Sequence, residues 1–208
     1  MLPEGLGCGV SRGADAILTL ELRLAMPNTA SGFLAEATLG LKYVRSKIDF
    51  GSSNKFTDNL RTLGVTALAV PEVYKLEERY LKAMNVPIPI EGSANWQQYG
   101  LQYIESMAGS AELMGTGNCE ELAAMAFMFF RNRRVLPVDY VMIPGKHAFC
   151  VIGARVRLGT GNFSEWSTGI SMACDPWSGR AEPADMIAIR YPAYLRKMFS
   201  AYRVPAEP

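Results

Sequence analysis

The sequence predicts an α+β fold in which helices come first and a further helix packs on a small antiparallel sheet. Apolar residues recur at helical spacing in several segments of residues 33–114, and runs rich in Val, Ile, Phe and Tyr follow from residue 138 onward. Helices and strands that are segregated along the chain, rather than alternating, are typical of this fold class. The 208-residue chain is 49% hydrophobic and 20% charged, so it can bury the core of one domain.

Residues 1–32 are expected to be a loosely ordered segment, because they are rich in Gly, Ser, Ala and Pro and show no clear periodicity. Their one apolar stretch, residues 16–26, carries Glu21 and Arg23 and does not follow a basic region, so it does not predict a Sec signal peptide. No apolar run reaches the roughly 18 to 20 residues that a membrane span needs. The four cysteines show no close pairing and are expected to be reduced, which fits a protein made in a cytoplasm.

Residues 33–114 are predicted to form a helical lobe. A break at FGSSN follows the first helix, and its serines or Asn54 can cap the second. Pro71 suits the first turn of a third helix, and Ser93 or Asn95 can cap a fourth. The predicted helices are 33–48, 55–63, 71–84 and 96–114.

Residues 115–190 are predicted to hold a single helix and a sheet, and residues 191–208 a last helix and a tail. The first two strand-like runs are separated by Pro144 and Gly145, and a polar loop precedes the third. The predicted elements are a helix at 118–131, strands at 138–143, 147–156 and 169–174, and a helix at 191–202. Together with the lobe they are expected to form a single domain, residues 33–208.

Cys119 is the candidate nucleophile. In the segment GTGNCEE, Asn118 is a good N-cap residue, and Glu121 three residues later completes a pattern typical of a capping box. This places Cys119 at the first helical position, where unpaired backbone N–H groups and the positive end of the helix dipole favour the reactive thiolate.

A nucleophilic cysteine needs a base, and the sequence contains one histidine, His147. Asp175, in ACDPW, ends the next predicted strand, where it can orient the imidazole. Because successive strand residues alternate between faces, Cys150 and Cys174 are expected to point away from such a site, into the core.

Other site chemistries fit less well. Cys119, His147, Cys150 and Cys174 are zinc-ligand types, but no C-x2-C spacing exists and strand alternation separates His147 from Cys150, so no metal is predicted. Neither a phosphate-binding loop nor a dinucleotide fingerprint is present. The net charge of +1 gives no basic excess for binding nucleic acid.

The segments GNCEELAAMAF, KHAFCVIG and ACDPWSG resemble the papain-like and transglutaminase-like cysteine enzymes. They are especially similar to bacterial effector-type members with a G-N-C-x-E, H-x-F and D-P-W pattern. Several of these are glutamine deamidases, and relatives are thiol proteases, transglutaminases or acyltransferases. The resemblance covers about residues 115–180. It implies the papain-like or transglutaminase-like fold, with Cys119 as nucleophile, His147 as base and acid, and Asp175 as the residue that orients it.

The resemblance also implies an oxyanion donor, which no motif identifies in this chain. The candidates are Asn118, Gln97, Gln98 and Gln102, and Trp177 is a candidate for lining the cleft. The implied partner is a substrate protein, from a host cell in the effector case, with no cofactor. We expect a monomer, made in a bacterial cytoplasm and delivered by a specialised secretion system.

Three hypotheses remain open at this point. The first is a thiol enzyme acting on an amide of a partner protein, with glutamine deamidation favoured over proteolysis and transglutamination by the resemblance alone. The second is a binding module that keeps the fold without catalysis and recognises its partner through the helical lobe. The third is a structural domain stabilised by a metal.

Overall fold

The computed structural model describes residues 28–52, 55, 58, 65–83, 94–159, 163–166 and 169–206. Its helices and strands are α2 (Ala30–Lys47), α4 (Val65–Ala83), α5 (Ala94–Met114), α6 (Cys119–Asn132), β1 (Val138–Ile143), β2 (His147–Ile152), α7 (Phe163–Trp166), β3 (Met172–Asp175), β4 (Arg180–Pro183), α8 (Met186–Arg190), the 3-10 turn η1 (Pro192–Tyr194) and β5 (Phe199–Val204). The predicted α+β class is confirmed. Helices α2 to α6 precede the sheet as predicted, whereas α7 and α8, which lie between strands, were not predicted. Most of the predicted segment 1–32 and of the predicted helix 55–63 lies outside the described residues.

The sheet has the strand order β4-β3-β2-β1-β5, and all neighbouring strands run antiparallel. A tight turn joins β1 to β2, because Gly145 adopts a positive φ of 63° and the N–H of Lys146 donates to the carbonyl of Ile143 at 2.9 Å. In this antiparallel arrangement the start of β2 and the end of β3 lie at the same end of the sheet. His147 and Asp175 are therefore brought together by topology alone.

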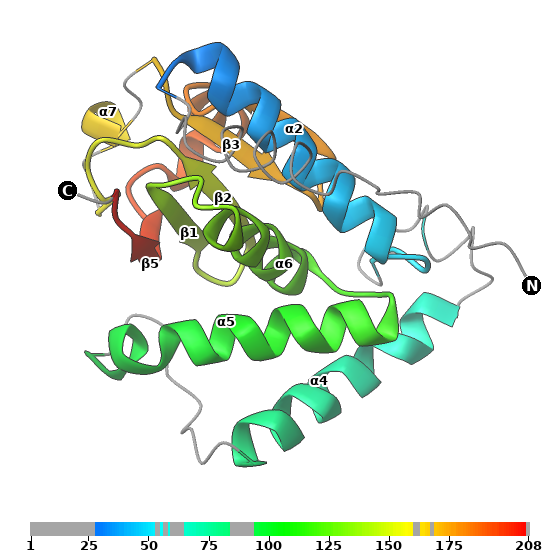
Figure 1. The fold of residues 1–208 in the computed structure, drawn as a ribbon. Helices are drawn as coiled ribbons and strands as arrows, with labels where there is room; N and C mark the ends of the chain where they lie inside the picture. Colours follow the sequence, from blue (N-terminus) through cyan, green and yellow to red (C-terminus); the bar gives the residue numbers. More distant parts are fainter. Residues whose placement is uncertain are drawn as a thin grey trace, which may run out of the picture.

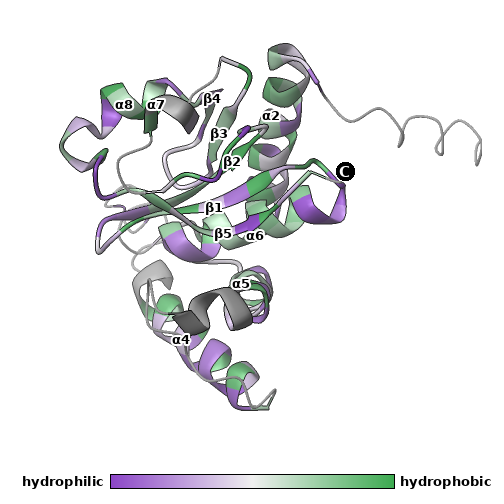
Figure 2. Ribbon diagram, turned by 90° about the vertical axis from the view of Figure 1, so that its left-hand side faces the viewer, coloured by the Kyte–Doolittle hydropathy of each residue, from purple (hydrophilic) through white to green (hydrophobic). Residues whose placement is uncertain are grey.

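Helices cover both faces of the sheet (Figure 1). Figure 2 shows the sheet with α2 and α6 on one side, and with α7 and α8 on the other. The first core, between the sheet and α2, α5 and α6, includes Phe127, Tyr140, Cys150 and Cys174. The second core, on the opposite face, includes Phe149, Ala173 and Ile187 together with Trp166. Cys150 and Cys174 thus lie in the core, as strand alternation predicts.

Helix α6 is central to the molecule, and its sequence explains its position. It is rich in Ala, Leu, Met and Phe, and the side chains from Leu122 to Phe127 are all buried. It contacts α2 and α5 as well as strands β1 and β2. Two hydrogen bonds join it to the sheet: the Tyr140 hydroxyl donates to the carbonyl of Glu120 at 3.1 Å, and the Cys150 thiol donates to the carbonyl of Ala123 at 3.0 Å. The N-terminal end of α6 is therefore held rigidly.

The lobe helices begin earlier than the sequence pattern suggests. Residues 30–32, expected within the loosely ordered segment, form the first turn of α2, because Thr29 acts as N-cap and its Oγ1 accepts the N–H of Gly32 at 3.2 Å. Helix α4 likewise begins at Val65, so Pro71 lies inside the helix and not in its first turn. Pro71 is exposed, and burial of Val70 and Val73 beside it outweighs the local cost of proline.

The predicted helix at 191–202 is wrong. This segment contains the short turn η1 and the first part of β5, which pairs with β1 from Val138↔Val204 to Met142↔Phe199. Periodicity cannot reveal this pairing, because the edge of β1 that receives β5 is created only by the fold. The predicted strand 147–156 ends at residue 152, and the predicted strand 169–174 is shifted to 172–175.

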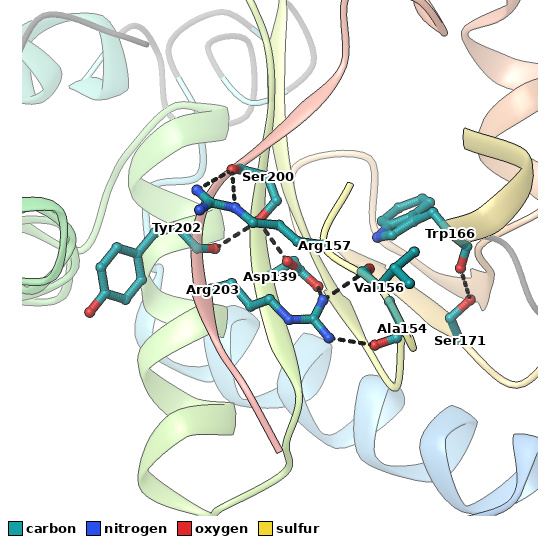
Figure 3. A network of polar contacts seen from close by, with 9 residues as sticks. All are labelled: Asp139, Ala154, Val156, Arg157, Trp166, Ser171, Ser200, Tyr202 and Arg203. Atoms are coloured by element: carbon teal, nitrogen blue, oxygen red, sulfur yellow. Dashed lines mark hydrogen bonds and ion pairs between the residues drawn. The ribbon is translucent and has the colours of Figure 1, made fainter. Parts of the chain in front are cut away.

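A buried polar network fixes β5 against β1 (Figure 3). Asp139 has no exposed surface; it accepts from the Ser200 hydroxyl at 2.6 Å and pairs with Arg203 at 2.6 Å. The second Arg203 nitrogen donates to the carbonyl of Ala154 at 2.7 Å, and Arg157 donates to the carbonyl of Ser200 at 2.8 Å. Burial raises the pKa of Asp139 to about 6, although the Arg203 charge opposes this shift.

Candidate functional site

Cys119 begins helix α6, as its sequence context predicts. Asn118 precedes it as N-cap in extended backbone, and its N–H donates to Glu121 Oε2 at 2.7 Å, within a capping box. Cys119 is partly exposed, whereas Cys150 and Cys174 are fully buried. Of these three described cysteines, Cys119 alone is open to a reagent or substrate.

The loop before Cys119 is anchored to the segment that follows α2. The Thr116 hydroxyl donates to the carbonyl of Gly51 at 2.7 Å, and the N–H of Gly117 donates to the same carbonyl at 3.3 Å. A Cβ at Gly117 would lie 2.9 Å from Cβ of Glu121, so the residue before Asn118 needs to be small. This crowding explains the Gly-Asn-Cys order in physical terms.

The Asn118 side chain is held from both sides. Its Oδ1 accepts from the Ser52 hydroxyl at 3.0 Å, and its Nδ2 donates to the Tyr74 hydroxyl at 2.8 Å. Asn118 therefore connects the segment after α2 with helix α4 of the lobe. The Asn118 Nδ2 group carries two N–H donors, and the Tyr74 hydroxyl accepts one of them.

His147 and Asp175 form a buried pair at one end of the sheet. His147 Nε2 and Asp175 Oδ2 are 2.7 Å apart, and each side chain is only 5% exposed. The Asp175 carboxylate is itself oriented, because its Oδ1 accepts the N–H of Ser178 at 3.0 Å. Ser178 lies in a turn in which the N–H of Gly179 donates to the carbonyl of Asp175 at 2.8 Å.

The Cys119 side chain lies near enough to His147 to raise the pKa of the imidazole. Because Nε2 is engaged by Asp175, Nδ1 is the ring nitrogen that remains for the thiol. The structure thus brings Cys119, His147 and Asp175 together in the order that the sequence analysis expects. Strand alternation places the His147 and Asp175 side chains on the face opposite α6, so Cys119 meets them around the end of the sheet.

The electrostatics of the pair favour a charged imidazolium. Burial alone would lower the pKa of His147, but its hydrogen bond to Asp175 and the nearby Cys119 side chain outweigh this effect and raise the pKa to about 9. Burial alone would raise the pKa of Asp175, but the hydrogen bond and charge of His147 hold it below its usual value. At neutral pH the pair is therefore an imidazolium beside a carboxylate.

Three aromatic rings surround the imidazole. Trp177 meets the His147 ring edge-on with centroids 5.2 Å apart, and the rings of Tyr191 and Phe149 lie 5.5 Å and 5.9 Å from it. Trp177, which was predicted to line a cleft, packs against the ring of His147. Tyr191 and Phe149 were missed, because nothing in the local sequence distinguishes them from packing residues. These rings shield the charged pair from water.

The remaining oxyanion candidates are not joined to the triad by a described contact. Gln102 lies on α5, and its Oε1 is buried without a hydrogen-bond partner. The side chains of Gln97 and Gln98 lie outside the described part of the structure. The first N–H groups of α6 have no carbonyl four residues earlier in the helix to accept them. They are donors of the kind that binds an oxyanion.

A cluster of acidic side chains, Glu77, Glu120 and Glu121, was not foreseen from the sequence. Glu77 of α4 is 7% exposed, and its burial and the charge of Glu121 raise its pKa to about 7. It shares a hydrogen bond with Tyr103 of α5, whose own pKa is raised chiefly by burial and by the Glu77 charge. The only sequence signal for Glu77 is its place on the apolar side of a predicted helix.

A pocket of about 310 Å³ adjoins the site. It lies between the end of α2, the segment after it, the first turn of α6 and the turn after β3. Its lining residues are Val44, Arg45, Ile48, Gly51, Ser52, Lys55, Asp58, Leu122 and Pro176.

Among the described residues, no group of three or more His, Cys, Asp or Glu side chains is arranged to hold a metal ion. Within the same part of the chain, no helix combines the length and apolar character required to cross a bilayer. No protein-family model matches the chain, and no curated protein or solved structure is significantly similar to it.

Proposed function

We propose that the protein is a cysteine-dependent enzyme that attacks an amide of a partner protein through Cys119, His147 and Asp175. One observation carries the proposal: a partly exposed cysteine at a helix N-terminus lies beside a histidine whose pKa it raises, and this histidine pairs with a buried aspartate at 2.7 Å. Nucleophile, base and orienting acceptor in this geometry are the parts that acyl-transfer catalysis needs. We assign the papain-like or transglutaminase-like fold on the same basis, since a helix bearing the cysteine packs on an antiparallel sheet bearing the other two residues.

The chemistry follows from the arrangement. The Cys119 thiolate attacks the amide carbonyl, and N–H groups at the start of α6 stabilise the oxyanion that forms. The His147 imidazolium gives its proton to the departing nitrogen, and Asp175 holds the ring for this transfer. The resulting acyl-thioester is cleaved by water that His147, now neutral, activates. The cysteine and the imidazolium are then restored.

The favoured substrate is the side-chain amide of a protein glutamine. The base and its carboxylate are enclosed by aromatic rings, and only Cys119 of the triad is partly exposed. A slender side chain reaches such a centre more readily than a length of polypeptide backbone does. Proteolysis and transglutamination share the same acyl-thioester and differ only in the bond broken or in the acceptor. The bacterial effector origin is proposed with this activity, on the resemblance of the three motifs.

Ammonia release from glutamine-containing peptide amides tests the proposal, with intact mass of a protein mixture as a second readout. We expect ammonia release and a mass gain from amide to acid, both lost in Cys119→Ala. Cleaved products would point to a protease, and ammonia-losing crosslinks to a transglutaminase. A non-catalytic binding module predicts instead that iodoacetamide labels Cys119 no faster than an ordinary exposed thiol. That last result would overturn the proposal.

A further inference from the structure

Three residues that line the pocket beside the site are close in sequence or by hydrogen bond to Cys119 or Asp175. Ser52, in its wall, donates to Oδ1 of Asn118, which directly precedes Cys119. Pro176, also in its wall, directly follows Asp175. Leu122, one helical turn after Cys119, lines the pocket from α6. The pocket therefore adjoins the start of α6, which carries Cys119, and the turn that follows Asp175.

Two cations line the pocket without an acidic partner. Arg45 donates only to the carbonyl of Gly179, at a long 3.5 Å, and Lys55 lies over the Trp177 ring at 4.9 Å. Neither forms an ion pair among the described residues, whereas Lys47, in the same helical turn as Arg45, pairs with Glu112 at 2.7 Å. Glycine at position 179 leaves room for the Arg45 guanidinium, because a Cβ at this position would overlap it.

Asp58 is the one acidic side chain among the described residues that line the pocket, and it already makes local contacts. Asp58 Oδ2 accepts the N–H of Ser52 at 2.9 Å and lies close to Gly51, where it holds the pocket wall. Among the described lining residues, Arg45 and Lys55 outnumber Asp58, so their net charge is positive. The Lys55 ammonium lies over the Trp177 ring, and the same ring meets His147 edge-on, so Trp177 connects the pocket wall to the imidazole.

We propose that this pocket binds a carboxylate of the substrate, next to the amide that Cys119 attacks. A guanidinium and an ammonium that converge on one pocket are the groups that recognise a carboxylate. The preferred substrate segment therefore carries an acidic group beside the reactive glutamine. This inference rests on the proposed function and specifies its substrate class.

A matched pair of thiol reagents tests the pocket without requiring turnover. The α-amides of N-iodoacetyl-glutamate and N-iodoacetyl-glutamine have nearly the same size and differ by one negative charge. We expect Cys119 to react roughly tenfold faster with the glutamate reagent at low salt, since charge-assisted contacts strengthen binding severalfold. Arg45→Gln and Lys55→Gln should each remove most of this preference. Lys47→Gln, which removes an equal charge from the same end of α2, should keep it.

Two negative results are distinguishable. Fast, Cys119-selective labelling without a charge preference, or with a preference that Arg45→Gln and Lys55→Gln leave unchanged, overturns the pocket assignment and leaves the proposed function standing. Labelling that is equally slow at Cys119 and at an ordinary exposed thiol overturns the proposed function first. Thermal melting checks that each surface variant is folded.

The carboxylate can come from an acidic side chain or from a chain terminus, and peptide substrates distinguish the two. One peptide amide carries Glu next to the reactive glutamine, a second carries Gln in its place, and a third has the glutamine at a free carboxyl terminus. A kcat/KM advantage of the first peptide that is lost in Arg45→Gln identifies an acidic side chain. The same advantage for the third peptide identifies a terminal carboxylate. Equal kcat/KM for all three contradicts the proposal.

Discussion

Three cysteines of the described chain differ sharply in their surroundings, and these surroundings set their chemistry. Cys119 is partly exposed beside an imidazolium, whereas burial raises the pKa of Cys150 and Cys174 well above the ordinary thiol value. We therefore expect Cys119→Ala to abolish turnover while leaving the fold intact. Cys150→Ala and Cys174→Ala should keep turnover and cost about 1 kcal/mol of unfolding free energy. Turnover of a glutamine peptide and urea denaturation measure the two effects, and full activity of Cys119→Ala would disprove the triad.

The pairing of His147 with Asp175 sets a pH dependence. The pKa of folded His147 is raised to about 9, above its usual 6.5, so the folded state holds this proton more tightly than the unfolded chain. The resulting stability is fully present below about pH 6.5 and is lost as pH rises through about 9.

Activity that needs the imidazolium should fall over the same alkaline range. In Asp175→Asn this alkaline limb of kcat/KM should move to lower pH, since the carboxylate no longer supports the charge. An unmoved limb would show that Asp175 does not act on the histidine.

At the scale of the element, Asn118 determines how α6 begins. Replacing it with Ala removes the cap side chain and its bonds to Ser52 and Tyr74. We expect Asn118→Ala to lower the unfolding free energy by about 1 kcal/mol and to slow alkylation of Cys119, because the helix start is less firmly held. Tyr74→Phe is the matched control, since it removes one of these bonds and leaves the cap. An alkylation rate in Asn118→Ala that equals the wild-type rate at every pH would mean that the helix end does not activate the thiol.

Strand β5 depends on the buried Asp139–Arg203 pair. Arg203→Met should cost about 3–5 kcal/mol near pH 8, because it leaves the Asp139 charge buried without its partner. The pKa of Asp139 is already raised to about 6, so its contribution to stability is most favourable at acid pH and declines as pH rises through about 6. The cost of Arg203→Met should therefore be smaller at pH 5 than at pH 8. Denaturant unfolding at both values measures it, and an equal cost at both would contradict this account.

At the scale of the whole molecule, the lobe formed by α4 and α5 is the place where we expect selectivity for a protein partner. The core triad serves many specificities, so recognition must come from what surrounds it. Leu68 and Tyr80 on α4 are 77% and 44% exposed. Leu68→Ser and Tyr80→Ser should weaken processing of a protein substrate and leave iodoacetamide labelling of Cys119 unchanged.

Ile189 on α8, which covers the opposite face of the sheet, supplies the matched control for the lobe variants. It is 70% exposed, so Ile189→Ser removes a comparable apolar side chain away from the lobe. If the α4 variants process the protein substrate as well as Ile189→Ser does, the lobe only completes the core. Selectivity then comes from the loops around the site.

Local patterns alone predict a good part of the fold. The helices that became α2, α5 and α6 and the strand β1 follow from periodicity, caps and β-branched runs, each of which acts between residues close in sequence. The prediction of a helix at 191–202 is wrong because these residues suit a helix or a strand equally well. The strand β1, with which part of the segment pairs, lies far away in the chain. The start of α4 was also predicted too late, because Pro71 suits the first turn of a helix but lies inside α4.

The sequence by itself determined the candidate residues for the proposed chemistry: a capped cysteine, a single histidine and an aspartate that ends a strand. Their chemical types and their places at element ends were visible without any long-range contact. Only the tertiary structure decided how they meet, with Nε2 of His147 on Asp175 and the thiol reached around the end of the sheet. It also decided that Tyr191 encloses the base and that Arg45 and Lys55 converge on one pocket. The physical reason is that these groups belong to different elements, and only burial of the shared core brings those elements together.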